Sequence, residues 1–496
     1  MGCGSSKVAV STVLVNGTQD GAILKDANGN ITQSKPIGSN EKERLGSQLG
    51  SSNRLGPVES LGIFRKRKKN LYQSLDVFEQ IDQRSVTVPS TVSRTAQSLV
   101  QYLTEPYEAP LFKLRAIWIW VTHNISYDVN SFFNPSEKKS SQLDASDVLS
   151  SGKAICSGYA NLINVLAESA GIKTERVDGW SKGYNYQYGQ KFGDMSPNHA
   201  WNVVKLNNDW WLLDSTWGAG YVDKEKNFVR QYSEHYFLTD PKQFIFDHCP
   251  TDMHWQLLEE MIAVERFENY ARVTKHFFRL KMKLFSHQNG IVVCETGRLH
   301  LKFRIDKDIP IKCTGKLSEV DGDVDTDQYI HVYSTEKTLH VLVDVPRVGQ
   351  FDLKIFAREL NSEQSNLNLV CRYAITCTNK LGPSSSFPRQ FKRWSPGFYL
   401  HSPTDGVLYN GETYKFRISL PNVTEMAVCL GGKNSTWERI PNSRGALWEG
   451  EITLPDWVER VNVVARFEEK TPFSSLLEYK VAEKDWAIEN CENEHS

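Results

Sequence analysis

Apolar residues recur at helical spacing in the first part of the chain. They return every three or four positions over 92–103 and again over 111–125, which predicts two helices, the second ending near Tyr127. The same spacing follows Cys156, and Gly171 is placed to end that helix as a C′ residue. The pattern therefore predicts a helical layer in which one helix begins at Cys156.

Apolar runs after this layer predict strands. Residues 173–180 read as a strand that packs against the helices. Two further runs, one starting at His199 and one over Trp210–Asp214, are separated by Asn207–Asn208, a dipeptide that suits a two-residue hairpin turn. Residues 243–262 read as helical, so we expect a closing helix there.

Beyond about residue 270 the pattern changes to short strands separated by turn residues, which is typical of β-sandwiches. A weak internal repeat is present, in which a Ser-initiated turn ending in glycine precedes the tetrapeptide Lys-Phe-Arg-Ile. Its two copies are Ser286–Gly290 with Lys302–Ile305, and Ser402–Gly406 with Lys415–Ile418. The repeat predicts two related sandwich domains.

The pattern as a whole predicts an α+β core followed by all-β sandwich domains. The first part of the chain is rich in Ser, Gly, Asn and charge, so it cannot bury enough apolar surface to offset chain entropy. We expect six segments: a disordered tether (1–88), the α+β core (89–268), a first β-sandwich (269–380), a Ser-rich linker (381–395), a second β-sandwich (396–482) and an acidic tail (483–496).

Composition narrows the class of protein. The chain has 496 residues and a formal net charge of −1, which argues against nucleic acid as the main partner. Nine cysteines occur without CxxC pairs, which disfavours a zinc site or a disulfide scaffold and favours a reducing cytosol. No apolar run reaches transmembrane length and no secretory signal precedes the globular part, so we expect a cytoplasmic protein.

The first residues match the pattern for N-terminal acylation. Gly2 would accept myristate after removal of Met1, and the neighbouring Cys3 would accept palmitate. One acyl chain holds a membrane only marginally, so a second signal is needed, supplied by Cys3 or by the basic run Arg65–Lys69. The alternatives are a chance match for Gly2 and a solvated linker for the basic run. We expect attachment to the inner face of the plasma membrane.

Cys156, His199 and Asp214 together predict a catalytic triad. A thiol attacks carbonyl carbons well only as thiolate, which a helix N-terminus or a neighbouring imidazole favours. If Asn207–Asn208 form the hairpin loop, Asp214 lies diagonally next to His199 on the same face of the sheet. Each residue alone has an ordinary interpretation, as a core cysteine, a structural histidine and a turn aspartate. Their combination favours an active site.

The residues around this triad resemble the signature blocks of the transglutaminase-like superfamily. These blocks are Gly-Lys-Ala-Ile-Cys-Ser-Gly-Tyr-Ala around Cys156, His-Ala-Trp-Asn from His199, and Trp-Leu-Leu-Asp-Ser-Thr-Trp around Asp214. The segment from His235 to Leu258 resembles the kyphoscoliosis-peptidase branch, whose members are largely associated with the cytoskeleton. The resemblance implies a papain-like core with Cys156 as nucleophile, His199 as base and Asp214 as the residue that orients the base.

The function expected from these observations is that of a thiol peptidase acting on amide bonds of proteins, with cytoskeletal substrates. Two alternatives stay open at this point. The same triad would serve a transglutaminase that crosslinks proteins, and a protein with an inert triad would be a scaffold that binds cytoskeletal partners. We expect no cofactor and no metal, because no Asp/Asn/Gly loop has calcium-binding spacing.

Overall fold

A computed structural model describes residues 24–25, 31–32, 68–134, 144–306, 308–320, 327–363, 365–381 and 386–483. The chain divides into two compact units, residues 1–57 and 58–496. Of the first unit, the described part is an antiparallel pair, β1 (Leu24–Lys25) with β2 (Ile31–Thr32). The predicted acylation residues Gly2 and Cys3 lie outside the described residues, as do Arg65 to Arg67 of the basic run.

The larger unit begins with helices that form one side of the α+β core. In chain order they are η2 (Lys68–Asn70), η3 (Leu75–Phe78), α2 (Glu79–Val86), α3 (Ala96–Thr104), α4 (Pro110–Asn124), α5 (Val129–Phe133), α6 (Ala145–Ser151) and α7 (Cys156–Ser169). The predicted helices α3, α4 and α7 are thereby confirmed. Among the helices of the described residues, none has both the length and the apolar character needed to cross a membrane.

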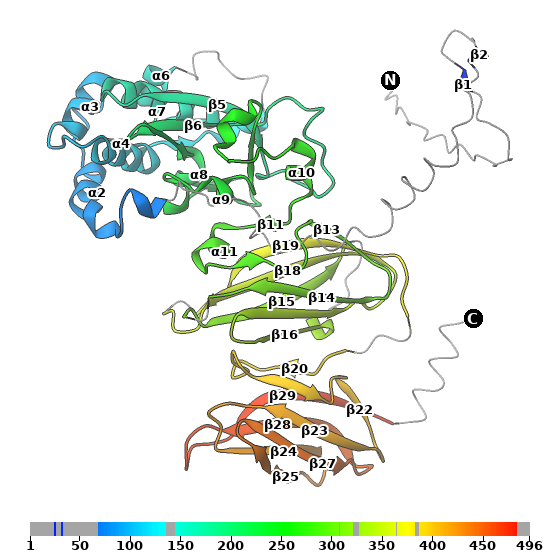
Figure 1. The fold of residues 1–496 in the computed structure, drawn as a ribbon. Coiled ribbons are helices and arrows are strands. Elements are labelled where there is room, and N and C mark those ends of the chain that lie inside the picture. Colours follow the sequence, from blue (N-terminus) through cyan, green and yellow to red (C-terminus); the bar gives the residue numbers. More distant parts are fainter. Residues whose placement is uncertain are drawn as a thin grey trace, which may run out of the picture. The chain divides into compact units, whose positions relative to one another are not determined.

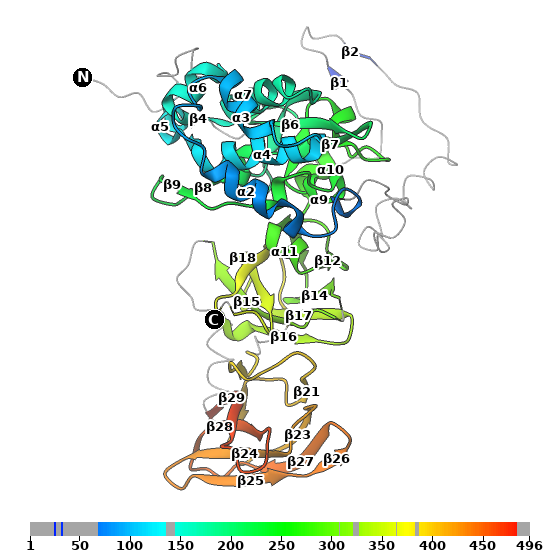
Figure 2. The same ribbon diagram turned by 90° about the vertical axis from the view of Figure 1, so that its left-hand side faces the viewer.

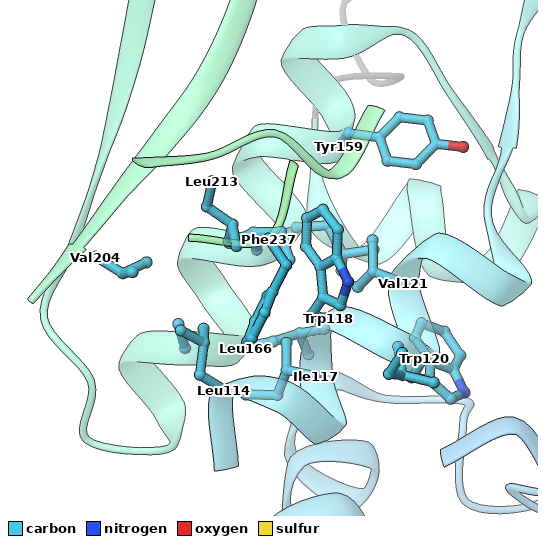
Figure 3. Close-up of a cluster of buried hydrophobic side chains, with 14 of the residues drawn as sticks. Leu114, Ile117, Trp118, Trp120, Val121, Tyr159, Leu166, Val204, Leu213 and Phe237 are labelled. Carbon is cyan, nitrogen blue, oxygen red and sulfur yellow. The ribbon is translucent and has the colours of Figure 1, made fainter. Parts of the chain in front are cut away.

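Helix α4 lies at the centre of this core. It is apolar on every side over most of its length, which is the pattern of a buried helix. Its Trp118 has no exposed surface, and the ring lies 5.4 Å from that of Phe237. Figure 3 shows Trp118 beside Phe237 and Leu166, the latter from α7. Trp118 and Trp120 are therefore core residues, as their position in an apolar helix indicates.

The boundary expected at residue 88 is wrong, because residues 68–86 belong to the core. Phe78 has no exposed surface, and its ring packs at 6.1 Å against both Phe112 and Phe237. Lys68 of the basic run donates to Glu234 at 3.1 Å, so its charge has a partner inside the fold. The Ser-, Gly- and Asn-rich composition that predicts a tether belongs to the residues before this segment, whereas here Phe78, Ile81 and an ion pair join the chain to the core.

A four-stranded antiparallel sheet packs against α7, in the order β10-β5-β6-β7. Its strands are β5 (Thr174–Ser181), β6 (His199–Leu206), β7 (Asp209–Leu213) and β10 (His248–Pro250). Both views of the ribbon show α7 beside β6 (Figure 1, Figure 2). The hairpin has the predicted register, with Leu206 opposite Asp209, and Asn207 and Asn208 have positive φ angles of 50° and 67°, as a type I′ turn requires.

The remaining short elements complete the core domain. They are β3 (Ser126–Tyr127), β4 (Lys153–Ala154), α8 (Ser215–Ala219), β8 (Gly220–Val222), β9 (Phe228–Arg230), η6 (Glu234–Tyr236), α9 (Pro241–Phe244), η7 (Met253–Gln256) and α10 (Val264–Asn269). The helix predicted over 243–262 is wrong. Pro250 has no N–H to continue a helix, and His248–Pro250 instead pair with β5 as a strand.

The first β-sandwich follows the core. One sheet has the order β11-β19-β18-β15 with β13 beside β19, and the other has the order β12-β14-β17-β16. The elements are β11 (Arg272–Val273), α11 (Lys275–Arg279), β12 (Lys283–Leu284), β13 (Ile291–Cys294), β14 (Arg298–Arg304), β15 (Ile311–Glu319), η8 (Asp327–Tyr329), β16 (Ile330–Ser334), β17 (Thr338–Asp344), β18 (Gly349–Glu359) and β19 (Asn368–Cys377).

The second β-sandwich repeats this topology. Its sheets have the orders β20-β29-β28-β24-β25, with β22 beside β29, and β21-β23-β27-β26. The strands are β20 (Arg389–Gln390), β21 (Tyr399–Ser402), β22 (Val407–Tyr409), β23 (Thr413–Ser419), β24 (Glu425–Gly432), β25 (Thr436–Ile440), β26 (Asn442–Arg444), β27 (Leu447–Thr453), β28 (Val458–Arg466) and β29 (Ser474–Ala482).

The repeated Lys-Phe-Arg-Ile tetrapeptides start in β14 and β23, which occupy the same place in their sheets. The linker expected over 381–395 needs correction, because part of it belongs to the second sandwich. Residues Arg389–Gln390 pair with β29, and Trp394 is only 4% exposed. The Ser-rich composition of this segment predicted a linker, but it gave no sign that the nearby Trp394 is buried.

Gly218 of α8 offers a test of the packing behind the sheet. A Cβ at this position would lie 2.3 Å from Cη2 of Trp118, the central core residue. Gly218→Ala is therefore expected to lower the free energy of unfolding by about 2–3 kcal/mol, as overpacking does. Urea unfolding measures this. The matched control is Gly193→Ala, whose Cβ would meet Val264 at an ordinary 3.5 Å. Equal stability of the two variants would contradict the packing described here.

Candidate active site

The thiol of Cys156 lies at the start of α7. Cys156 is the first residue of this 14-residue helix, where free backbone N–H groups and the positive end of the helix dipole favour a negative charge. The helix ends as predicted, with Gly171 at a positive φ of 79°. The side chain is half-buried, and it accepts a hydrogen bond from the backbone N–H of Ala200. These contacts place the sulfur in a setting that stabilises thiolate.

His199 and Asp214 come together at the edge of the hairpin. Nε2 of His199 lies 2.9 Å from Oδ2 of Asp214, and both side chains are buried. His199 also hydrogen-bonds Cys156. Because Nε2 faces the carboxylate, this second contact falls to Nδ1. The structure therefore joins His199 directly to Asp214, and the hydrogen bond and charge of His199 lower the pKa of the Cys156 thiol.

Electrostatics among these three residues favour a charged thiolate and imidazolium. Burial alone raises the pKa of the Cys156 thiol, but the hydrogen bond and charge of His199 outweigh it and the pKa is lowered. Burial alone lowers the pKa of His199, but the charge and hydrogen bond of Asp214, together with Cys156, raise it to about 10. A thiolate–imidazolium pair is the form that these pKa shifts stabilise.

The Asp214 carboxylate has four hydrogen-bond partners. Oδ1 accepts from the backbone N–H groups of Thr216 at 2.9 Å and Trp217 at 3.1 Å, so Asp214 is the N-cap of α8. Oδ2 faces Nε2 of His199 and Nε2 of His248. Burial alone raises the pKa of Asp214, but the charges and hydrogen bonds of the two histidines hold it well below its usual value. The carboxylate is therefore ionised at neutral pH.

The sequence analysis missed His248. This residue has no exposed surface, and its Nε2 lies 3.0 Å from Oδ2 of Asp214. Its Nδ1 lies 2.6 Å from Oδ1 of Asp247. The segment 243–262 had been interpreted as helical, and no local signal places a histidine of that segment behind the carboxylate of a distant hairpin.

His199, Asp214 and His248 are also the residues that could hold a metal ion. Within the described residues, their donor atoms form one group in which all lie within 4.8 Å of one another. Hydrogen bonds account for this geometry, because both Nε2 atoms point at the same carboxylate oxygen at 2.9 Å and 3.0 Å. The two imidazoles are therefore arranged as hydrogen-bond partners of one carboxylate oxygen.

The loop from Lys182 to Asn198, which leads to His199, is held at several points. Asn198 accepts the backbone N–H of Ser181 at 2.7 Å. Glu268 of α10 accepts the backbone N–H of Phe192 at 2.6 Å, and Lys182 donates to the carbonyl of Tyr270 at 2.9 Å. These contacts hold the loop that precedes His199, and the β6 strand holds the residues that follow it.

Tyr127 of β3 lies close to the reactive thiol. Burial raises the pKa of its phenol, and the charge of Cys156 raises it further. The phenol therefore keeps its proton and can donate a hydrogen bond.

Two segments of the chain match known protein families. Residues 97–215 match the family model of the transglutaminase-like superfamily, and residues 264–388 match that of the KY-like, immunoglobulin-like domain. The kyphoscoliosis peptidases of Mus musculus and Homo sapiens are each 26% identical over 533 residues, covering 84% of this chain and 79% of the relative.

A solved crystal structure of a TGase is 18% identical and covers 36% of this chain and 40% of its own, at a TM-score of 0.20. The chain thus carries a transglutaminase-like domain followed by a KY-like, immunoglobulin-like domain, and over 84% of its length it is similar to the kyphoscoliosis peptidases.

Proposed function

We propose that this chain is a thiol enzyme that hydrolyses amide bonds in proteins. The observation that carries the proposal is the buried contact between His199 and Asp214 at 2.9 Å, beside a thiol whose pKa His199 lowers, at the start of a 14-residue helix. A nucleophile, its base and the group that orients the base are the parts that acyl transfer requires.

The reaction would begin with the thiolate. Cys156 attacks the carbonyl carbon, a C–S bond forms, and backbone N–H groups at the start of α7 hold the oxyanion. The His199 imidazolium gives its proton to the leaving amine as the C–N bond breaks. Water then attacks the acyl-enzyme while His199 takes a proton from it. The C–S bond breaks, and the acid leaves as the Cys156 thiolate is restored beside the imidazolium. Asp214 keeps the imidazole in the tautomer that faces Cys156.

A crosslinking transglutaminase would use the same three residues, with a lysine amine as acceptor in place of water. We favour hydrolysis because the relatives that share most of this chain's length are named peptidases. A scaffold with an inert triad is less well supported, since burying a carboxylate between two imidazoles costs desolvation that a binding module has no need to bear. Following the family resemblance, we propose cytoskeletal proteins as substrates.

Alkylation of the intact protein by iodoacetamide tests the proposal. At pH 7, Cys156 is expected to react at least about tenfold faster in the parent than in His199→Ala, because the lowered thiol pKa depends on the imidazole. Mass spectrometry measures labelling at each cysteine. Cys249, Cys313 and Cys371 serve as internal controls, since burial raises the pKa of each thiol to about 12. Labelling of Cys156 no faster than these three would overturn the proposal.

The products distinguish the two acyl acceptors. Incubation of a glutamine-containing substrate protein with a lysine-bearing peptide gives new amino termini if water accepts the acyl group of a backbone amide. It gives a higher-mass conjugate if the lysine amine accepts the acyl group of a glutamine side chain. Hydrolysis should fall as the pH rises through about 10, where His199 loses the proton that the leaving amine needs.

A further inference from the structure

We propose that His248 is a positioning residue that holds the Asp214 carboxylate in place, extending the hydrogen bonds from His199 through Asp214 to Asp247. The inference rests on the function proposed above and adds to it a fourth and a fifth side chain. Neither residue belongs to the three sequence blocks around Cys156, His199 and Asp214.

The contacts of His248 join two carboxylates. Nε2 lies 3.0 Å from Oδ2 of Asp214, and Nδ1 lies 2.6 Å from Oδ1 of Asp247. The His248 and Asp214 side chains have no exposed surface, whereas that of Asp247 is 13% exposed. Ionised carboxylates accept hydrogen bonds and do not donate them, so each ring nitrogen of His248 faces an acceptor. His248 thereby links the buried carboxylate to one that reaches the surface.

Packing leaves the His248 ring little freedom. Phe244 stacks on it with ring centroids 4.0 Å apart and an interplanar angle of 18°. Trp201 meets it edge-on at 5.2 Å, and Trp217 lies 4.5 Å away. The backbone is held by the β10–β5 ladder, in which His248 is opposite Ser181. Nε2 is therefore aimed at Asp214 by the surrounding fold.

The geometry explains why Asp214 needs this second imidazole. Its Oδ1 accepts from two backbone N–H groups of α8, which leaves Oδ2 as the oxygen that the histidines face. Oδ2 is then fixed by His199 on one side and His248 on the other. His199 must change its protonation state during the reaction, whereas His248 contacts no reacting atom. His248 therefore contacts the carboxylate on the side away from the reacting atoms.

The charged and titratable groups that face this pair come from several elements. His248 faces Asp214 and Asp247, and the Asp247 carboxylate also accepts from the hydroxyl of Tyr236 at 3.3 Å. The charge of Lys182 also acts on Asp247. A purely structural His248 would only fill the space between Phe244 and Trp201, and the test must separate that role from the hydrogen bond to Asp214.

Three substitutions of His248 distinguish the contribution of Nε2 from that of Nδ1. In His248→Gln the side-chain amide nitrogen occupies about the place of Nε2, and in His248→Asn it occupies about the place of Nδ1. His248→Phe keeps the ring shape and removes both donors. The readout is the pH dependence of alkylation of Cys156 by iodoacetamide in the intact protein, which requires no substrate.

We expect His248→Phe and His248→Asn to move the acid limb of this profile upward by about one pH unit, lowering the rate about tenfold at pH values on that limb. His248→Gln should keep the rate within about threefold of the parent, because it restores the donor to Asp214. Urea unfolding of each variant shows how much of any change comes from stability. Equal profiles for Gln and Asn, or profiles that follow stability alone, would overturn the proposal.

Asp247→Asn provides a second variant that leaves the imidazole in place. It removes the charge behind His248 and keeps an oxygen that can accept from Nδ1, so we expect a shift of the acid limb in the same direction but smaller than in His248→Phe. An unshifted profile in both variants would contradict a positioning role. A parent in which Cys156 reacts no faster than the buried cysteines would instead contradict the proposed function, so the two failures are distinguishable.

Discussion

Replacing Cys156 by serine is expected to lower amide hydrolysis by about 10⁴-fold or more, the loss seen when a catalytic nucleophile is removed. A serine hydroxyl at this position has the same imidazole neighbour, but it does not ionise as the lowered pKa allows the thiol to do. The free energy of unfolding should change by less than about 1 kcal/mol, because the two side chains are nearly equal in size. Peptide-amide hydrolysis and urea unfolding measure the two quantities.

The matched control for this prediction is Cys429→Ser. Cys429 is another half-buried free cysteine, placed in β24 of the second sandwich. The same chemical change there should leave hydrolysis at the parent rate. If Cys156→Ser hydrolysed as fast as the control, the thiol would not be the nucleophile and the scaffold would become the better description.

Asp214→Ala is expected to lower both activity and stability. Activity should fall by about 10⁴-fold, since the imidazole loses the group that fixes its tautomer. The free energy of unfolding should fall by about 3–5 kcal/mol, the range for removing one partner of a buried charged pair. The change leaves the imidazoles of His199 and His248 without their acceptor and α8 without its cap. Thermal and urea unfolding at neutral pH measure this loss.

The pH dependence of this loss has a definite sign. The folded-state pKa of Asp214 is depressed, so its stabilisation is complete above the unfolded value of about 3.9 and is lost as the pH falls below it. The pKa of His199 is raised to about 10, so its contribution is complete below about 6.5 and is lost as the pH rises from there to 10. The difference between parent and Asp214→Ala should therefore be largest between about pH 4 and 6.5.

Asp214→Asn is the control that keeps the shape of the side chain. Its oxygen can still cap α8, while its amide cannot accept from both imidazoles. It should retain more stability than Asp214→Ala and show a similar loss of activity. Equal stability of the parent and Asp214→Ala at neutral pH would show that the buried contacts contribute nothing, contrary to the geometry.

Local patterns predicted the parts of the site that lie close together in the sequence. The helix that begins at Cys156 follows from apolar spacing and a terminal glycine. The β6–β7 register follows from Asn207–Asn208, because that dipeptide admits the positive φ angles that a tight turn needs. Once this register was predicted, the contact between His199 and Asp214 followed, and the structure has it at 2.9 Å.

The same local reasoning failed where distant segments decide the outcome. Residues 68–86 looked like a tether, yet Arg115 of α4 donates to Asp82 and to Glu234, each at 2.7 Å. The chain between these two carboxylates is more than a hundred residues long, so no window of sequence contains the network. Residues 243–262 were predicted to be helical because their apolar runs are short. The periodicity of a short apolar run cannot distinguish a helix from a buried strand.

Local sequence patterns were enough to predict the chemistry of the candidate site, which is a thiol at a helix start with an imidazole and a carboxylate on one face of a hairpin. They also predicted the two related sandwiches after the core. These depend on contacts within a turn or across one hairpin, where spacing and turn residues decide. The contact of His248 with the Asp214 carboxylate, in contrast, depends on the tertiary fold. His248 reaches Asp214 because β10 pairs with β5, a strand about seventy residues earlier in the chain, and such long-range pairing is stabilised by the assembled core.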